Sequence, residues 1–542
     1  MAADPEPTLP QQAALVAALR QHLAAQTGAP VLLLETHISW VLVAGERAYK
    51  LKKALRTPFL DAHTLALRHA QGLEELRLNR RLAPALYLDL LPVTGPAAAP
   101  RLGGPGSVLE WAVAMRAFAQ QGLWQHLAEH GTLRPEMVDA LALQLAQFHA
   151  AAAVAPPDGP WGSGARVRDA LQDNLNELAP LLEASQCAKV LAPLQAWAQA
   201  QGPRLAPLFA RRLAQGFVRE GHGDLHLGNV VQIDGQPTAF DGIDFNPALR
   251  WIDTADDIAF LAMDLQAHGL PALAHRFVNA WVEASGDVQG LRLLPWYQVN
   301  RALVRAKVAL LRAVQPGERG GPGEARDRES AQRYLDLAVA LATQPARLQG
   351  RPALLLMHGL AGSGKSTLAL ALVQAMGALR LRSDVQRKRL AGLAPGQASG
   401  SALNAGLYDA ANTQHTYRHL LRLAAAVLHG GRPVVLDASF LRRAPRDAAR
   451  RLARRLGVPL LILDLVVDEA TLRQRLLQRR QAGQDPSEAD AAVLQAQLAS
   501  AEALQPDEMP QVLRLPPPLD LQAVHDALAR QGASTLCRMA GT

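Results

Sequence analysis

The sequence predicts two domains of different fold class, an α+β domain followed by an α/β domain with a parallel sheet. The chain has 542 residues, which is too long for one typical core. Its first part opens with strand-like runs and continues into long Ala/Leu-rich helices, whereas strands alternate with helices from residue 352 onward. We therefore expect domains at 1–343 and 352–525, a linker at 344–351 and a tail at 526–542.

Composition and charge narrow the class of protein. Apolar residues make up 49% and charged residues 19%, the ordinary balance of a globular protein rather than of a disordered chain. The net charge is +8, but the basic residues are mostly arginines scattered along Ala/Leu-rich helices. That distribution favours solvated helix faces over a block that binds nucleic acid. Nucleic acid is therefore the less favoured partner.

Cysteine usage and hydropathy predict the compartment. Cys187 and Cys537 are the only cysteines, and they lie far apart without CxxC spacing or a His cluster. Neither a disulfide framework nor a zinc site is therefore predicted. The N-terminal residues are acidic and contain proline, and no run of about 18 apolar residues occurs. We expect a soluble, cytoplasmic protein that does not enter a membrane.

The first domain begins with alternating strand and helix patterns. A helix is predicted at 15–25, followed by strands at 31–34 and 40–52, with a hairpin turn at Gly45-Glu46-Arg47. Helical spacing follows at 63–82, and a further strand is predicted at 108–118. From about residue 122 onward, helices dominate.

Glycines surround a lysine directly after a buried-type strand in the second domain. Residues 359–366 read Gly-Leu-Ala-Gly-Ser-Gly-Lys-Ser, between a strand at 353–357 and a helix at 367–376. In such a P-loop the backbone N–H groups wrap phosphates, and the helix directs its positive end at them. Lys365 should reach the β- and γ-phosphates of ATP, and Ser366 should bind Mg²⁺. We expect nucleotide contacts from Gly359, Leu360, Ala361, Gly362, Ser363, Gly364, Lys365, Ser366 and Thr367.

Two acids follow predicted strands downstream. Asp384 lies in the stretch at 381–387, where the next strand of such a sheet would end, and Asp437 ends the strand at 434–437. Ligands of such sheets bind outside the carboxyl ends of the strands, so Asp384 is placed to meet a substrate hydroxyl. Asp437 is placed to hold Mg²⁺ or to orient the nucleophile. A helix-capping role is the alternative for both acids.

A helix at 472–480 carries several arginines, which stabilise a transferring phosphoryl group when a lid closes. Solvated charge is the alternative interpretation of this helix, and the sequence does not decide which arginine acts. Arg475 is our candidate.

The motifs from 352 to 500 resemble those of AAA-type P-loop kinases related to polynucleotide kinase, zeta toxins and gluconate kinase. In the polynucleotide kinase-like pattern an Asp-x-x-Arg pair follows the P-loop, and Asp384 and Arg387 match it. The resemblance implies that Asp384 is the general base and that Arg387 contacts a substrate phosphate or supports the base. The arginine-rich lid and the stretch at 485–489 also suit this group.

The first domain contains a second phosphotransfer motif. Residues 222–229 fit H-x-D-x-x-x-x-N, with Asp224 placed to orient or deprotonate a hydroxyl and Asn229 placed to bind Mg²⁺. A second metal ligand should end the next hairpin strand. Asp241 fits this position and Asp244 competes with it; the shorter spacing from Asn229 favours Asp241.

This combination resembles the aminoglycoside phosphotransferase and choline kinase branch of the protein-kinase-like fold, over about residues 30–340. The later Asp-Ile-Ala-Phe of that pattern is present, beginning at Asp257. The resemblance implies Asp224 as catalytic base and Asn229 and Asp241 as Mg²⁺ ligands. His222 and His226 are expected to be structural, since no ligand cluster accompanies them.

In such kinases a strand lysine pairs the α- and β-phosphates and is held by a helix glutamate. We expect Lys50 and Glu75 in these roles, with Lys52 and Glu74 as rivals. The hinge that binds adenine is expected near residues 110–115. The sequence departs from the family in lacking a G-x-G-x-x-G loop before Lys50, because the turn reads Val-Ala-Gly-Glu-Arg at 43–47.

The full arrangement resembles bacterial two-domain proteins in which an aminoglycoside phosphotransferase-like kinase is joined to a P-loop kinase. It predicts an ATP- and Mg²⁺-dependent phosphotransferase that acts on a small-molecule hydroxyl at one or both sites. Two alternatives stay open: one domain only senses nucleotide, or the P-loop domain phosphorylates nucleic-acid 5′ ends. No motif identifies the acceptor.

Overall fold

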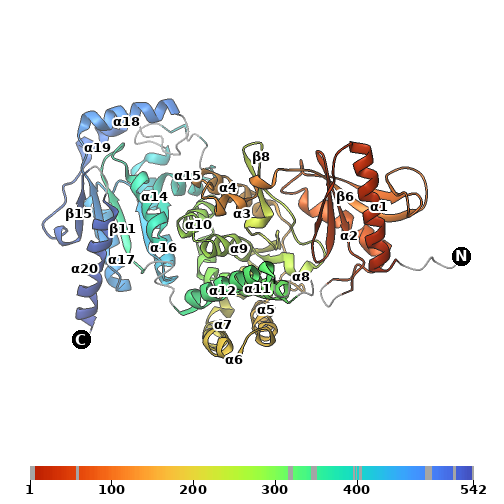
Figure 1. Cartoon of the computed structure of the whole chain (residues 1–542). Coiled ribbons are helices and arrows are strands. Elements are labelled where there is room, and N and C mark those ends of the chain that lie inside the picture. The colour runs from red at the N-terminus through yellow and green to blue at the C-terminus, as the bar shows by residue number, and fades with distance from the viewer. Residues whose placement is uncertain are drawn as a thin grey trace. The chain divides into compact units, whose positions relative to one another are not determined.

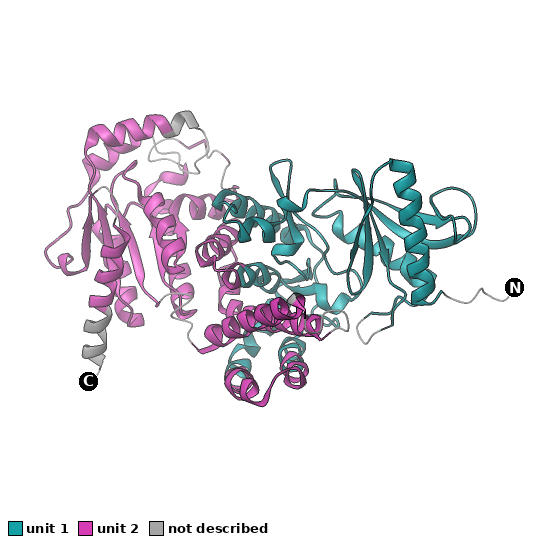
Figure 2. Ribbon diagram, viewed as in Figure 1, with its two compact units in different colours: residues 1–173, 200–264 teal, residues 174–199, 265–542 magenta. Residues whose placement is uncertain are grey.

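The computed structural model describes residues 7–56, 60–314, 321–343, 351–394, 397, 400–401, 406–482, 491–516 and 520–539. Of the expected linker, residues 344–350 lie outside the described residues, as do the stretch at 485–489 and residues 540–542 of the tail. Figure 1 labels the helices and strands along the chain. The chain divides into two compact units, which we call unit 1 (1–173 and 200–264) and unit 2 (174–199 and 265–542) (Figure 2).

Unit 1 begins with a six-stranded antiparallel sheet. Its spatial order is β1-β2-β3-β6-β4-β5. The strands are β1 (Leu32–Glu35), β2 (Ser39–Ala44), β3 (Arg47–Lys52), β4 (Tyr87–Thr94), β5 (Arg101–Leu102) and β6 (Val108–Arg116). The strand expected at 40–52 is thus broken at the predicted turn.

Two helices pack on the sheet. Helix α1 (Leu9–Thr27) contributes to the hydrophobic core that contains Leu51. Helix α2 (Leu65–Asn79) contributes to a second core that contains Ala48. Successive side chains of a strand point to opposite faces. Lys50 and Lys52 therefore share the face of Ala48, the face that α2 covers.

The rest of unit 1 consists of helices and two short strand pairs. The helices are α3 (Trp124–Glu129), α4 (Pro135–Ala151) and α8 (Pro247–Arg250), together with parts of α5 (Gly164–Leu178), α7 (Ala192–Ala214) and α9 (Thr254–Ala267). Strand β7 (Val218–Glu220) pairs with β10 (Trp251–Asp253), and β8 (Val230–Ile233) forms a hairpin with β9 (Gln236–Ala239). The loop between β7 and β8 and the loop after β9 carry the predicted site residues.

Unit 2 contains a five-stranded parallel sheet in the order β12-β13-β11-β14-β15. The strands are β11 (Leu354–His358), β12 (Leu379–Arg382), β13 (Val434–Asp437), β14 (Leu460–Leu465) and β15 (Val512–Leu515). The parallel sheet predicted from strand–helix alternation is confirmed.

The helices of unit 2 fall into two groups. One group precedes the parallel sheet in the chain: α6 (Ala184–Gln186), α10 (Pro271–Ser285), α11 (Leu294–Ala313) and α12 (Pro322–Thr343). The other alternates with its strands: α14 (Lys365–Met376), α15 (Ser383–Leu390), α16 (Ala410–His429), α17 (Arg443–Leu456), α18 (Glu469–Ala482), α19 (Ala491–Ser500) and α20 (Leu521–Met539). No helix in the described part of the chain has the length and apolar character needed to cross a bilayer.

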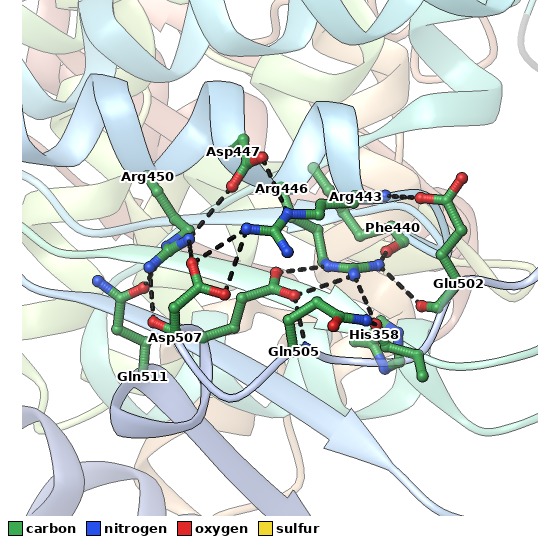
Figure 3. Close-up of polar contacts among 12 residues, drawn as sticks. His358, Phe440, Arg443, Arg446, Asp447, Arg450, Glu502, Gln505, Asp507 and Gln511 are labelled. Atoms are coloured by element: carbon green, nitrogen blue, oxygen red, sulfur yellow. Dashed lines mark hydrogen bonds and ion pairs between the residues drawn. The ribbon is translucent and has the colours of Figure 1, made fainter.

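A buried ion pair ties α17 to the loop before β15 (Figure 3). Arg446 binds Glu508 through Nε (2.7 Å) and Nη2 (3.1 Å), and both side chains are completely buried. Arg446 also donates through Nη1 to the carbonyl of Phe440 (3.0 Å). Phe440 has φ 46°, a left-handed conformation that is costly for a bulky residue. The guanidinium therefore fixes both the loop and the strained turn after β13.

Arg446→Met should lower the free energy of unfolding of the parallel-sheet part by about 3–5 kcal/mol, because Glu508 is left charged and buried. Arg443→Met is the matched control: Arg443 pairs with Asp507 at a half-exposed position, so a loss of at most about 1 kcal/mol is expected. Urea titration with peptide-resolved hydrogen exchange of β11–β15 measures both. Equal losses for the two variants would contradict the assignment.

Candidate functional site

In unit 1 the loop between β7 and β8 presents Asp224. Its side chain is 36% exposed. The amide of Asn229 donates to the Asp224 carboxylate and to the Asp224 carbonyl, both at 3.0 Å. These two predicted residues are therefore in direct contact, and the contact fixes the orientation of the acid.

Buried Asp257 shapes this loop. Its carboxylate accepts the backbone N–H groups of His222 (2.8 Å) and Gly223 (3.0 Å) and lies 3.1 Å from Nε2 of His149. Burial alone would raise the pKa of Asp257, but the hydrogen bond and charge of His149, followed by His222, hold it well below its ordinary value. Gly223 has φ 83°, and a Cβ there would lie 2.6 Å from the carbonyl of Leu249. The Asp-Ile-Ala-Phe motif thus acts by holding the backbone beside Asp224.

Lysines 50 and 52 share one glutamate. Glu75 is fully buried, and its Oε1 and Oε2 lie 2.8 Å from Lys50 and Lys52, respectively. Lys50 also contacts Asp241, and Lys52 contacts Asp244. The predicted Lys50–Glu75 pair is present, and the rival Lys52 belongs to the same network.

The network is strongly ionised. Burial alone would raise the pKa of Glu75, but Lys50 and then Lys52 lower it to about 2. Burial lowers the pKa of Lys50, yet the attraction of Asp241 and Glu75 outweighs it and leaves the pKa well above its ordinary value. The charges therefore persist at neutral pH despite burial.

The two candidate metal acids differ in exposure. The side chain of Asp241 is 44% exposed, whereas that of Asp244 is only 6% exposed. Burial, partly offset by Lys52, raises the pKa of Asp244. Asp241 has φ 60°, and its backbone N–H donates to the hydroxyl of Tyr87 (3.0 Å). Asp241 is therefore the acid with an accessible carboxylate, beside the lysine expected to bind phosphate.

Three details of the sequence-based picture change. Glu74, the rival of Glu75, pairs instead with Arg77 and Arg250. The hinge prediction at 110–115 is wrong, because these residues lie inside β6, whose backbone pairs with β3 and β4; the strand ends before residues 117–119. The turn at 43–47 joins β2 to β3, whereas β1 and β2 are joined by residues 36–38, which contain no glycine.

In unit 2 the P-loop lies between β11 and α14. Gly359, Gly362 and Gly364 have φ of 146°, 83° and 94°. A Cβ on Gly359 would lie 2.8 Å from Oγ of Ser363, and one on Gly362 would lie 3.0 Å from the carbonyl of Leu472. The loop therefore requires glycines for both conformation and space.

Polar contacts hold this loop from several elements. The ammonium of Lys365 donates to the carbonyls of Gly359 (3.0 Å) and Leu360 (2.7 Å). The N–H of Ala361 donates to Gln497 of α19 (2.8 Å), and Arg475 of α18 lies 3.4 Å from the carbonyl of Gly362. Arg475 thus lies beside the loop, and Gln497 is a contact that no sequence motif identified. Thr367 is exposed in the first turn of α14.

Asp437 and Ser366 form the candidate metal position. Ser366 hydrogen-bonds to the Asp437 carboxylate, and burial raises the pKa of Asp437, partly offset by Arg380 and Arg382. Oδ2 of Asp437 is buried and accepts no hydrogen bond from the described residues. A hydroxyl and a carboxylate oxygen are ligands that suit Mg²⁺.

Neither site is a metal cage built from the described residues alone. The described part of the chain contains no group of three or more His, Cys, Asp or Glu side chains that could hold a metal ion. Mg²⁺ in kinases is usually bound by one or two carboxylates plus phosphates and water. The residues present therefore fit a cation that arrives with a nucleotide.

Asp384 and Arg387 are in contact at the start of α15. Nη1 of Arg387 lies 3.0 Å from Oδ1 of Asp384, and the guanidinium lies over the ring of Tyr408 at 4.7 Å. Tyr417 hydrogen-bonds to Ser439 and lies close enough to Asp384 and Arg387 to interact with their charges. The carbonyl of Ser439 accepts the N–H of Gly359 at 3.3 Å. Contacts therefore connect the Asp-x-x-Arg pair to the first glycine of the P-loop.

Glu75→Gln should lower the melting temperature at pH 7, because Lys50 and Lys52 lose their shared counter-ion. The folded-state pKa lies below the ordinary 4.5, so the stabilisation by Glu75 is complete above about pH 4.5 and falls as the pH drops toward 2. The gap to wild type should narrow below pH 4.5 in melting curves recorded from pH 7 to 3. Glu129→Gln, at an exposed position, should give a small gap throughout. A Glu75→Gln gap that stayed constant down to pH 3 would contradict this account.

Two family models match the chain. The phosphotransferase enzyme family model covers residues 41–294, and an AAA domain model covers residues 354–504. The chain is 32% identical over 419 residues to uncharacterized proteins of Mycobacterium bovis and of two strains of Mycobacterium tuberculosis. The alignment covers 77% of this chain and 80% of each relative.

The solved structures that match the chain have low sequence identity and low TM-scores. A choline/ethanolamine kinase family protein from Mesorhizobium loti covers 60% of this chain and 99% of its own, at 13% identity and a TM-score of 0.35. A gluconokinase from Sinorhizobium meliloti covers 35% and 94%, at 23% identity and a TM-score of 0.24.

The assignment rests on the family models and the mycobacterial relatives. The P-loop described above lies inside the AAA match, and the Asp224 loop lies inside the phosphotransferase match. The chain is a kinase that belongs to the same family as these mycobacterial proteins, with a phosphotransferase enzyme family domain followed by a P-loop AAA domain.

Proposed function

We propose that the protein transfers the γ-phosphoryl group of ATP, in the presence of Mg²⁺, to a hydroxyl of a small molecule, at one or both of its two sites. The observation that supports this most strongly is the convergence of Lys365, Ser366 and Asp437 around a loop whose glycines are sterically required. Such a loop holds polyphosphate, and the neighbouring Asp384 supplies a base.

In the unit 1 site, Asp224 orients the acceptor hydroxyl and takes its proton. Asn229 and Asp241 bind the cation, and Lys50, held by Glu75, contacts the α- and β-phosphates. The side chains of Asp224 and Asp241 are partly exposed, which supports a role in binding ligand. Those of Glu75 and Asp244 are buried, which supports a role in holding the lysines.

In the unit 2 site, Asp384 acts as the base, while Arg387 contacts an anionic group of the acceptor or steadies the base. Ser366 and Asp437 hold the cation, which neutralises charge on the phosphates. Arg475 lies on the helix that packs against the P-loop through Leu472 and Leu476. That position suits a guanidinium that stabilises the transferring group.

A second candidate function applies to unit 1, namely nucleotide binding without transfer. The three-residue, glycine-free connection between β1 and β2 favours it, because kinases cover the phosphates with a glycine-rich loop. The sensing role and the transfer role predict the same binding and differ only in turnover.

Asp224→Asn and Asp384→Asn should each lower one phosphorylation activity by about 10²–10⁴-fold, because the carboxylate base is removed while the shape of the side chain is kept. The measurement is a mass-spectrometric screen of hydroxyl metabolites with Mg-ATP. Asp234→Asn and Asp526→Asn, at exposed positions in unit 1 and unit 2, are the matched controls. Turnover that survives the double substitution of Asp224 and Asp384 would contradict the proposal.

For the sensing role, Lys50→Met should weaken ATP binding by unit 1 while Asp224→Asn leaves binding intact. Isothermal titration calorimetry of ATP into a Lys365→Ala protein, in which the P-loop site is disabled, measures ATP binding by unit 1 alone. If the Asp384→Asn protein phosphorylates any acceptor, unit 1 is an enzyme and the sensing role is wrong.

A further inference from the structure

The ring of His226 is held in a fixed direction within the loop that carries Asp224. Its Nδ1 accepts the backbone N–H of Gly228 at 3.0 Å, so that His226 caps the short helix at 227–229. A Cβ on residue 228 would lie 3.0 Å from Cε1 of His226, a close contact that glycine avoids. The ring of Phe260, from α9, lies 5.6 Å away and is tilted by 58°. Contacts from two elements therefore set the direction in which the imidazole points.

The hydrogen bond to Nδ1 decides which nitrogen of the imidazole carries the proton. Because the N–H of Gly228 is a donor, Nδ1 is the acceptor, and the neutral ring carries its proton on Nε2. Nε2 lies 3.5 Å from Oδ2 of Asp224, and the side chain of His226 is only 12% exposed. The loop thus presents an N–H group to the carboxylate of the proposed base.

Two donors approach the same oxygen of Asp224. The amide nitrogen of Asn229 lies 3.0 Å from Oδ2 and also donates to the Asp224 carbonyl. The contact from His226 is longer, but hydrogen bonds to a general base are often long before substrate binds and tighten in the complex. A carboxylate held by one donor can still turn about its Cβ–Cγ bond, and a second donor from another direction restricts that rotation. His226 is placed to supply the second donor.

We propose that His226 is a positioning residue of the unit 1 site: its Nε2–H holds Oδ2 of Asp224, so that the carboxylate faces the acceptor hydroxyl. The inference rests on the phosphoryl transfer proposed for unit 1. In that step the acceptor oxygen bonds to the γ-phosphorus and gives its proton to Asp224, while the bond from the γ-phosphorus to the bridging oxygen breaks and ADP leaves with the electron pair. A base that is turned away takes the proton less readily, so the donor affects turnover and not ATP binding.

Two substitutions separate the roles of the two nitrogens of His226. Asparagine places its amide oxygen near the position of Nδ1, so it keeps the bond to Gly228 but has no donor at the position of Nε2. Glutamine places its amide nitrogen near the position of Nε2, so it keeps the donor to Asp224. Each variant is made in the full chain that carries Asp384→Asn, which silences the P-loop site. The measurement is the release of inorganic phosphate from Mg-ATP, with water as the acceptor.

His226→Asn should lower kcat by about 10–100-fold, which is a part of the 10²–10⁴-fold that a general base contributes. The KM for ATP should stay unchanged, because the groups assigned to the phosphates are intact. His226→Gln should keep most of the kcat, because the donor is retained. His130→Asn, at an exposed position directly after α3, is the matched control and should leave kcat and KM unchanged.

The opposite order of activities overturns the inference. An active His226→Asn beside an impaired His226→Gln indicates that only the cap at Nδ1 matters, which is a merely structural role. Equal losses in the two variants, or a loss expressed in the KM for ATP alone, overturn it as well. If His226→Asn does not fold, Gly228→Ala displaces the ring instead, and an unchanged kcat in that variant overturns the inference.

Failure of the proposed function gives a different result. If the Asp384→Asn protein releases no phosphate that a further Asp224→Asn removes, unit 1 does not transfer the phosphoryl group, and the inference falls with that function. If this activity is present and His226→Asn retains all of it, the proposed function stands and the role of His226 is wrong.

Discussion

The two carboxylate oxygens of Glu75 are held by two different lysines, and the unit 1 site is arranged around those contacts. A buried carboxylate is stable only with its countercharge in place. The alternation of β3 puts Lys50 and Lys52 on one face, and α2 delivers Glu75 between them. Each lysine also contacts one acid of the loop after β9. The accessible Asp241 lies beside one lysine, and the buried Asp244 lies beside the other.

In the parallel sheet the governing constraint is the alignment of strand ends. The carboxyl ends of β11, β12 and β13 lie at one edge, so the P-loop, the first turn of α15 and Asp437 meet there. The turn after β13 is strained at Phe440 and is held by Arg446 from α17. Ser439 in that turn bonds to Gly359. The buried pair of Arg446 and Glu508 lies far along the chain from the P-loop. It nevertheless supports that loop through the turn after β13.

Local patterns predicted much of this. The P-loop, the strand–helix alternation and the H-x-D-x-x-x-x-N motif are short and carry their own geometry. The sequence could not separate Lys50 from Lys52, because both lie on one face and both bind Glu75. It misplaced the hinge, because hydropathy does not show that β6 is paired on both sides. It assigned no role to Gln497, since a contact across 136 residues leaves no local signal.

The packing of helix α10 is a feature that the sequence did not indicate. Composition places the break after residue 343, where α12 ends, and no pattern in α10 indicates that it faces a different sheet. Its apolar residues are buried as in any amphipathic helix. Two polar residues distinguish it: Asn279 accepts the backbone N–H of Arg380 in β12 (2.8 Å), and Glu283 pairs with the side chains of Arg380 and Arg382. Buried polar contacts of this kind specify a partner more than they add stability. A cut at the predicted linker would separate Arg380 and Arg382 from the carboxylate of Glu283, with which both pair.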